Sequence, residues 1–305
     1  MSSSSTIAQS MYTAKRTRLS LTATAVAALV HLLCGATAAA DERPNIVVVL
    51  ADDVGLSDIG AYGGEIKTPS LDALANEGIQ LTAFHAAPTC GPSRTMLLTG
   101  VDHHLAGAGI NAAGLVRLPI LQGRPGYEGY LNDDVVTFVS LLQDSGYHTY
   151  MTGKWDPGNK PGRLPIDHGF EKSFVLAAGG ASHFSDAIGT AALGASVTYY
   201  EDETPVEALP DDFFSSEFYT DQLIDYIESN GDDRPYMALL SYTAAHWPLQ
   251  VPDDWLDRYS GVYDNGWHAV REARFERMRS LDLLPETAEL PPTNRAVDSW
   301  DRLRS

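Results

Sequence analysis

Asn45-Ile46-Val47-Val48-Val49-Leu50, followed by Ala51-Asp52-Asp53, is the stretch of sequence that decides the fold. The five residues after Asn45 form an unbroken apolar run in which β-branched side chains predominate. Such a run predicts a strand that is buried on both faces of a parallel sheet. Two carboxylates come directly after this strand, at the position where parallel sheets carry functional groups.

Other segments extend this pattern along the chain. Thr68-Pro69 has the residue types of an N-cap and a first helical position, and predicts a helix that ends at Gly78. The remaining predicted elements are a helix over 135–145, a strand over 147–152, a helix around 219–227 and a strand over 236–242. Residues 153–210 are rich in Gly, Ala and Pro and predict loops and short strands over one face. This alternation predicts an α/β fold with a largely parallel central sheet flanked by helices.

Polar side chains follow each of the predicted strands. Asp52 and Asp53 follow the first strand, Lys154 follows the second and His246 follows the third. Ligands of open α/β sheets bind outside the carboxyl ends of the strands. We therefore expect these side chains to meet in one crevice, which has the layout of an active site.

The charge of the chain limits its partners. Its 305 residues carry a formal net charge of −19. Such acidity argues against nucleic acid and against anionic membrane surfaces as partners. A site for an anionic small molecule would have to supply its own positive charge.

The amino-terminal residues predict a signal peptide. A basic segment over 15–18 precedes a mostly apolar stretch over 19–33, and Ala38-Ala39-Ala40 offers the small residues of a cleavage site. A membrane anchor needs about 20 apolar residues, more than this stretch provides. We expect a signal peptide over 1–40, a catalytic domain over 41–305, no membrane anchor, and a secreted or periplasmic location.

Cysteine usage draws attention to one position. Cys34 and Cys90 are the only cysteines, and removal of the signal peptide leaves Cys90 alone. A buried, unreactive thiol is the common explanation of such a residue. The neighbours of Cys90 in Cys90-Gly91-Pro92-Ser93-Arg94 favour a chemical role instead.

This motif and its surroundings resemble a known family. The sequence over 43–109 resembles the amino-terminal part of formylglycine-dependent (type I) sulfatases, and is most similar to bacterial arylsulfatases. The family's second signature corresponds to residues 146–155, and its histidine segment to His246-Trp247-Pro248. The resemblance extends to about Arg279 and implies an alkaline-phosphatase-like sulfatase fold. Family members are longer, so we expect the fold to be incomplete at the carboxyl end.

The resemblance implies a sulfuric ester hydrolase that acts on small sulfate esters. In such enzymes a separate formylglycine-generating enzyme reads Cys-x-Pro-x-Arg and oxidises the cysteine, here Cys90, to formylglycine. The hydrated aldehyde then attacks sulfur. Asp52, Asp53 and the modified Cys90 side chain would hold one calcium ion, because calcium prefers oxygen ligands, and the ion would polarise the sulfate.

The resemblance also assigns roles to three cationic or titratable residues. Arg94 lies four residues after Cys90, on the same side of a helix that is expected to begin near Pro92. There it would hold the hydrated aldehyde and the carboxylates. Lys154 and His246 would contact sulfate and stabilise the leaving oxygen, with His246 as general acid.

Some positions depart from the family pattern or are ambiguous. Asp156 stands where the family has a histidine that accepts a proton as sulfate leaves. An aspartate can act as a base, but it also places negative charge beside an anionic substrate. Asp264-Asn265 resembles a pair that completes the family's calcium site, yet no apolar strand precedes it, so we do not expect it to bind metal. For His103-His104 we expect loop packing.

Two rival functions follow from these departures. The first is a catalytically impaired relative that binds sulfated ligands, which is favoured by Asp156 and by the missing carboxyl-terminal ligands. The second is a phosphonate or phosphate ester hydrolase that uses the same modified cysteine. Comparing turnover of nitrophenyl sulfate with that of nitrophenyl phosphate would separate this second rival from a sulfatase.

Overall fold

A six-stranded sheet organises the chain. The computed structural model describes residues 43–190 and 195–303, so the predicted signal peptide lies outside the described residues. The strands, in spatial order, are β1 (Ile46–Leu50), β6 (Tyr236–Ser241), β2 (His148–Lys154), β3 (Lys172–Leu176), β4 (Tyr199–Glu201) and β5 (Thr204–Pro205). The first four run parallel, and β4 and β5 are antiparallel to their neighbours. This arrangement confirms the predicted α/β class.

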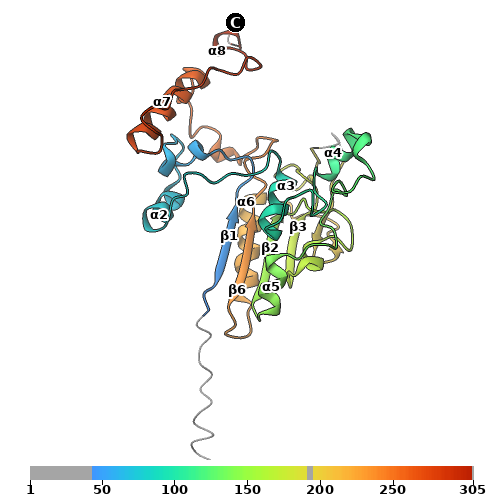
Figure 1. Cartoon of the computed structure of the whole chain (residues 1–305). Helices are drawn as coiled ribbons and strands as arrows, with labels where there is room; N and C mark the ends of the chain where they lie inside the picture. Colours follow the sequence, from blue (N-terminus) through green and yellow to red (C-terminus); the bar gives the residue numbers. More distant parts are fainter. Residues whose placement is uncertain (1–42, 191–194, 304–305) are drawn as a thin grey trace, which may run out of the picture. The chain divides into compact units, whose positions relative to one another are not determined.

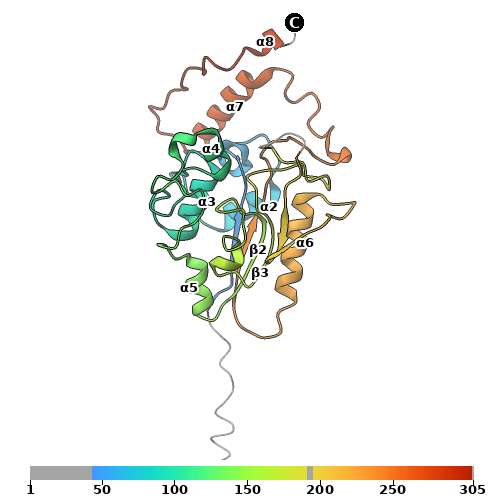
Figure 2. The same ribbon diagram turned by 90° about the vertical axis from the view of Figure 1, so that its right-hand side faces the viewer.

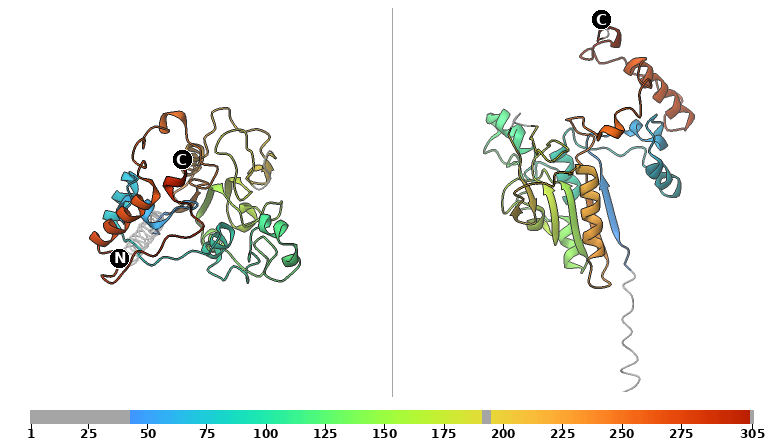
Figure 3. Two further views of the ribbon diagram at one scale, coloured as in Figure 1. Left: turned by 90° about the horizontal axis from the view of Figure 1, so that it is seen from above. Right: turned by 180° about the vertical axis from the view of Figure 1, so that it is seen from behind.

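Helices cover both faces of the central strands. Figure 2 shows α6 (Ser215–Glu228) on one side of the strands and α5 (Phe138–Asp144) on the other, with α3 (Cys90–Thr99) above α5. From behind, α6 lies directly over the sheet (right-hand view of Figure 3). No helix among the described residues is long and apolar enough to span a membrane.

Alternation along β6 and β2 explains why both faces are covered. Met237 and Leu239 pack into the core on the side of α5, whereas Ala238 and Leu240 pack with Tyr219 and Leu223 of α6. Successive side chains of a strand point to opposite faces, so apolar residues on both faces require a cover on each side, as Tyr150 and Met151 of β2 also show. The core is therefore built around these two central strands.

The prediction that β1 is buried on both faces is wrong. The side chains of Val47 and Val49 remain 54% exposed, whereas Ile46, Val48 and Leu50 are half-buried against the core. The reason is the place of β1 in the sheet. It is an edge strand that pairs with β6 (Figure 1), and no described helix covers the face that carries these two valines.

Other predicted elements occur with altered bounds. The helix α2 (Pro69–Glu77) begins and ends as predicted, α5 begins later than expected, and residues 153–210 contain β3, which lies within the sheet rather than over one face. The remaining helices are α4 (Ala112–Arg117), α7 (Gly266–Ser280), α8 (Trp300–Leu303) and five 3-10 turns at Leu56–Asp58, Gly60–Tyr62, Pro119–Leu121, Pro165–His168 and Asp253–Trp255. The helix α7 was not predicted.

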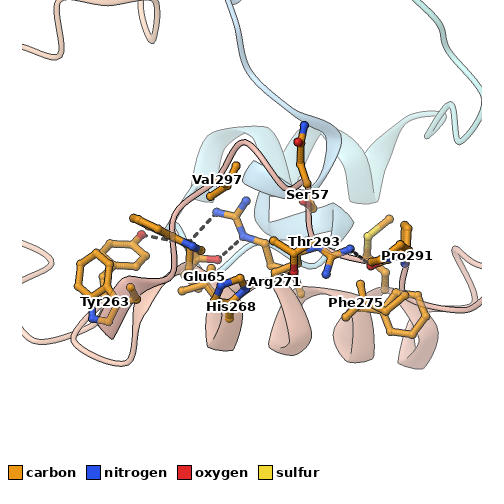
Figure 4. A pocket seen from close by; sticks show the side chains of 17 residues that line it. Ser57, Glu65, Tyr263, His268, Arg271, Phe275, Pro291, Thr293 and Val297 are labelled. Carbon is orange, nitrogen blue, oxygen red and sulfur yellow. Dashed lines mark hydrogen bonds and ion pairs between the residues drawn. The ribbon is translucent and has the colours of Figure 1, made fainter. Parts of the chain in front are cut away.

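An ion-pair network holds α7. Arg274 donates to Glu65 through Nε at 2.6 Å and Nη2 at 2.7 Å, and it also pairs with Asp58. Tyr263 donates to the same Glu65 carboxylate at 2.9 Å. These contacts lie beside a cavity of about 870 Å³ between α7 and residues 290–300 (Figure 4). Hydrogen bonding to Arg274 lowers the pKa of Glu65 to about 2.

Candidate active site

The carboxyl ends of three parallel strands bring the predicted residues to one edge of the sheet. Asp52 lies two residues after β1, Lys154 is the last residue of β2, and His246 lies five residues after β6. The three strands run side by side in the same direction (Figure 1). The backbone fixes this end of the sheet, since the Asp52 amide donates to the Ala244 carbonyl at 2.9 Å and the Ala245 amide donates to the Asp52 carbonyl at 2.8 Å.

Asp52 forms the centre of a buried charge cluster. Its Oδ2 accepts from Lys154 Nζ at 2.6 Å, and its Oδ1 lies 3.5 Å from Arg94 Nη2. Asp52 and Arg94 are 4% exposed, and Lys154 is fully buried. A buried cation without a partner is strongly destabilising. The Asp52 carboxylate therefore compensates two permanent cations that have little contact with water.

Arg94 connects the start of α3 to the ends of two strands. Its Nη1 donates to the Lys154 carbonyl at 3.0 Å and also contacts the Ser241 hydroxyl. Ser241 in turn donates to the Lys154 carbonyl at 2.7 Å. Ser241 was not among the predicted site residues. Its position as the last residue of β6 is the signal that could have identified it.

Cys90 is the first residue of α3, two positions earlier than the predicted start near Pro92. It is half-buried and lines a cavity of about 670 Å³ together with Asp52, Asp53 and Arg94. Burial raises the pKa of the Cys90 thiol, and the negative charge of Asp156 raises it further. The thiol is therefore kept in its neutral form, which is unlike the lowered pKa of a nucleophilic cysteine.

Asp156 lies against the start of α3. It is 6% exposed, its backbone is left-handed with φ 71°, and its Oδ2 is buried without a hydrogen-bond partner among the described residues. A Cβ atom on Gly91 would lie 3.2 Å from that oxygen. Buried carboxylate oxygens are normally paired, so an unpaired oxygen beside Cys90 is an unusual feature of this site.

His246 faces the exposed member of the acidic pair. Its Nδ1 lies 2.6 Å from the Trp247 carbonyl, and because a carbonyl only accepts, Nδ1 carries the hydrogen. Its Nε2 lies 3.9 Å from Asp53 Oδ2, and the Asp53 side chain is 60% exposed. His246 is thus oriented with Nε2 toward Asp53.

His183 supports His246 from behind and was not predicted. It is 2% exposed; its Nδ1 lies 2.8 Å from the Ser215 hydroxyl, and its Nε2 lies 3.2 Å from the His246 carbonyl. Burial lowers the pKa of His183. A neutral ring with hydrogen on Nε2 donates to the carbonyl and accepts from the hydroxyl. No sequence signal pointed to His183, because it lies in a segment without periodicity.

Asp264, Asn265, His103 and His104 are not among the residues that line the Cys90 cavity. Asp264-Asn265 precedes α7 rather than following a strand, as expected. The rings of His103 and His104 pack 4.2 Å apart, and with Asp102 they are the one group of three potential metal ligands found among the described residues. The predicted set of Asp52, Asp53 and Cys90 therefore does not form a three-ligand group of that closeness.

Comparison with protein families decides the relationship. The model of the Sulfatase family matches residues 44–299. The chain belongs to the sulfatase family. This confirms the resemblance that the motif over 90–94 indicated.

Relatives of this sulfatase-family chain share much of its sequence. An arylsulfatase of Klebsiella aerogenes is 41% identical over 269 residues, which cover 88% of this chain and 57% of the relative. An uncharacterised sulfatase of Schizosaccharomyces pombe is 40% identical over 273 residues, covering 87% of this chain and 49% of the relative. The chain thus spans about half the length of these relatives.

Solved structures agree on the fold of this sulfatase-family chain. Ps i-CgsB in complex with k-i-k-neocarrahexaose superposes with a TM-score of 0.58 at 21% identity, covering 79% of this chain and 53% of that one. A protein in complex with its substrate D-glucosamine-2-N,6-O-disulfate gives a TM-score of 0.53 at 26% identity, covering 73% of this chain and 38% of that one. The predicted fold is confirmed.

Proposed function

We propose that this chain hydrolyses sulfate esters, with water, to an alcohol and inorganic sulfate, after export from the cytoplasm. One observation carries the proposal. Arg94, which lies one helical turn from Cys90, contacts both Asp52 and the backbone of Lys154. These contacts join two of the sequence segments that resemble sulfatase signatures, 43–109 and 146–155, into one site. The arylsulfatase relative supports the same reaction class.

The nucleophile comes from Cys90. A formylglycine-generating enzyme would oxidise its side chain, and the hydrated aldehyde would then supply a hydroxyl for attack on sulfur. The place of Cys90 at the start of α3 supports this role, because a helix amino terminus favours negative charge. The raised pKa of the unmodified thiol also supports it, since a neutral thiol is poorly suited to act as the nucleophile itself.

The balance of charge supports a bound cation. Asp52, Asp53 and Asp156 oppose the two permanent cations Arg94 and Lys154, so the described site is net negative before an anionic ester enters. The residues fit a hard divalent ion in chemistry, because they offer carboxylate oxygens that outnumber the cations of the site. We propose that Asp52 and Asp53 hold calcium, which would acidify the attacking hydroxyl and polarise the sulfate.

Three residues of the chain would orient the reacting groups and donate a proton. Lys154 and Arg94 would hold the carboxylate of Asp52 in place and direct positive charge toward sulfate oxygens. His246 Nε2 lies 3.9 Å from Asp53 Oδ2, and from there it would deliver a proton to the leaving alcohol oxygen. The products of the balanced reaction are the alcohol, sulfate and one released proton.

Asp156 favours a second candidate function. Its buried, unpaired carboxylate oxygen lies beside the start of α3, where it would repel a sulfate group. A chain impaired in this way would bind sulfated ligands weakly and turn them over slowly. The two candidates differ in turnover rather than in ligand class.

The experiment is hydrolysis of 4-nitrophenyl sulfate by the chain produced with a formylglycine-generating enzyme. Mass spectrometry of the peptide that contains Cys90 measures conversion. Cys90→Ser should abolish hydrolysis, whereas Ser93→Ala, at a position of the motif that the modifying enzyme does not read, should keep both aldehyde and activity. Full conversion without turnover would favour the impaired relative. Turnover of nitrophenyl phosphate in preference to the sulfate would assign the chain to phosphate ester hydrolysis.

A further inference from the structure

A second cavity shares His246 with the proposed reaction centre. Its volume is about 780 Å³, within the range of small-molecule sites. It lies between the first turns of α6 and the segment 244–255, and its lining includes neither Cys90 nor Asp53. We refer to it as the His246 cavity. His246 is thus a lining residue of this cavity whose Nε2 lies 3.9 Å from Oδ2 of Asp53, a residue that lines the Cys90 cavity.

The apolar part of the lining suits a hydrophobic or aromatic group. Its apolar side chains include Phe214, Leu249, Val251, Trp255 and the prolines Pro248 and Pro252. Leu249 is 86% exposed and Trp255 is 46% exposed, so both present apolar area to whatever enters. Aromatic rings in such a lining can stack on a planar ligand.

The carboxylates of the lining are not balanced by lysine or arginine. Glu217 and Asp221 lie four residues apart on α6, and therefore on the same face of the helix. No lysine or arginine lines the cavity, and neither carboxylate has an ion-pair partner in the described part of the chain. Arg258, which stacks on the Trp255 ring, is not among the lining residues. The cavity therefore attracts positive and repels negative ligands.

We propose that the His246 cavity binds the alcohol portion of the sulfate ester and selects apolar alcohols that are neutral or positively charged over anionic ones. This inference rests on the proposed function, in which His246 protonates the leaving oxygen. The bond between sulfur and that oxygen must then lie at His246. In this arrangement the sulfate group faces Cys90 and Arg94. The carbon skeleton of the alcohol then extends into the His246 cavity.

Three substrates of equal size test the charge preference. They are phenyl sulfates that carry, through one methylene at the para position, an ammonium, a hydroxyl or a carboxylate group. At low ionic strength, kcat/KM should fall in that order, by about tenfold or more from first to last. The double variant Glu217→Gln, Asp221→Asn should bring the ammonium and carboxylate substrates to within about twofold to threefold.

A matched control uses the same helix. Asp225→Asn with Glu228→Gln removes two exposed carboxylates of α6 that do not line the cavity, and the substrate order should persist. Equal kcat/KM for all three substrates, or a preference that survives in the Glu217 and Asp221 double variant, would overturn the inference while leaving sulfatase activity intact.

A binding measurement separates this inference from the proposed function. Quenching of tryptophan fluorescence by 4-(aminomethyl)phenol and by 4-hydroxyphenylacetate reports occupancy without turnover. Tighter binding of the amine, lost in Trp255→Leu, supports the His246 cavity even if no ester is hydrolysed. Equal binding of the two phenols, or quenching unchanged in Trp255→Leu, contradicts it.

Discussion

Asp52→Asn should destabilise the chain far more than Asp53→Asn, although the two residues are adjacent. The Asp52 carboxylate is 4% exposed and compensates Lys154 and Arg94, which are buried as well. An amide keeps one acceptor oxygen but removes the charge, and it turns N–H donors toward cations. Breaking a buried ion pair in this way costs about 3–5 kcal/mol. Asp53 is 60% exposed, and its substitution should change stability by less than about 0.5 kcal/mol.

Urea unfolding followed by tryptophan fluorescence, with a chelator present, measures the difference. A third variant sharpens the test, because Lys154→Met in the Asp52→Asn background removes one of the uncompensated cations. It should recover at least about 1 kcal/mol. If Asp52→Asn and Asp53→Asn unfold at the same urea concentration, charge compensation is not what Asp52 provides.

Three further outcomes are expected. Glu65→Gln should lower stability by roughly 2 kcal/mol at pH 7. Arg274 lowers the pKa of Glu65 from 4.5 to about 2, so the loss of stability should persist above pH 4.5 and vanish as the pH falls through about 2. Urea unfolding measures this loss, and the variant Glu276→Gln, at an exposed position, is the control. His183→Asn should lower kcat about tenfold or more with little change in KM, in steady-state kinetics, because the His246 carbonyl loses its donor. Calorimetry should find calcium binding weaker than about 10⁻⁴ M, since few oxygen ligands are in place; tight stoichiometric binding would contradict this.

Elements with local signals were predictable from the sequence. The helix α2 follows from Thr68-Pro69 and Gly78, because capping and termination depend on neighbouring residues. The helix α7 has no comparable signal, and its contact between Arg274 and Glu65 joins residues far apart in the chain. The exposed face of β1 also depends on strand order, which a run of β-branched residues does not encode.

The position of the site could be predicted from the sequence, but the contacts between its side chains could not. The rule that functional residues follow parallel strands indicated where Asp52 and Lys154 would lie. The rule did not indicate that Lys154 Nζ donates to the Asp52 carboxylate rather than facing solvent. That contact depends on how deeply the lysine side chain is buried. Ser241 and His183 act on the predicted residues through the backbone, and such contacts leave no pattern in a single sequence.

The edge of β1 bears on how the isolated protein will behave in concentrated solution. Residues 46–50 are uncharged and branched, and among the described strands only β6 pairs with them. The outer row of backbone donors and acceptors is thus a template on which another extended chain can add, and Val47 and Val49 supply apolar contact for it. Soluble proteins usually protect such an edge with lysine, proline or a bulge. Self-association that grows with protein concentration, and that a lysine in place of Val49 relieves, is the consequence for purification and assay.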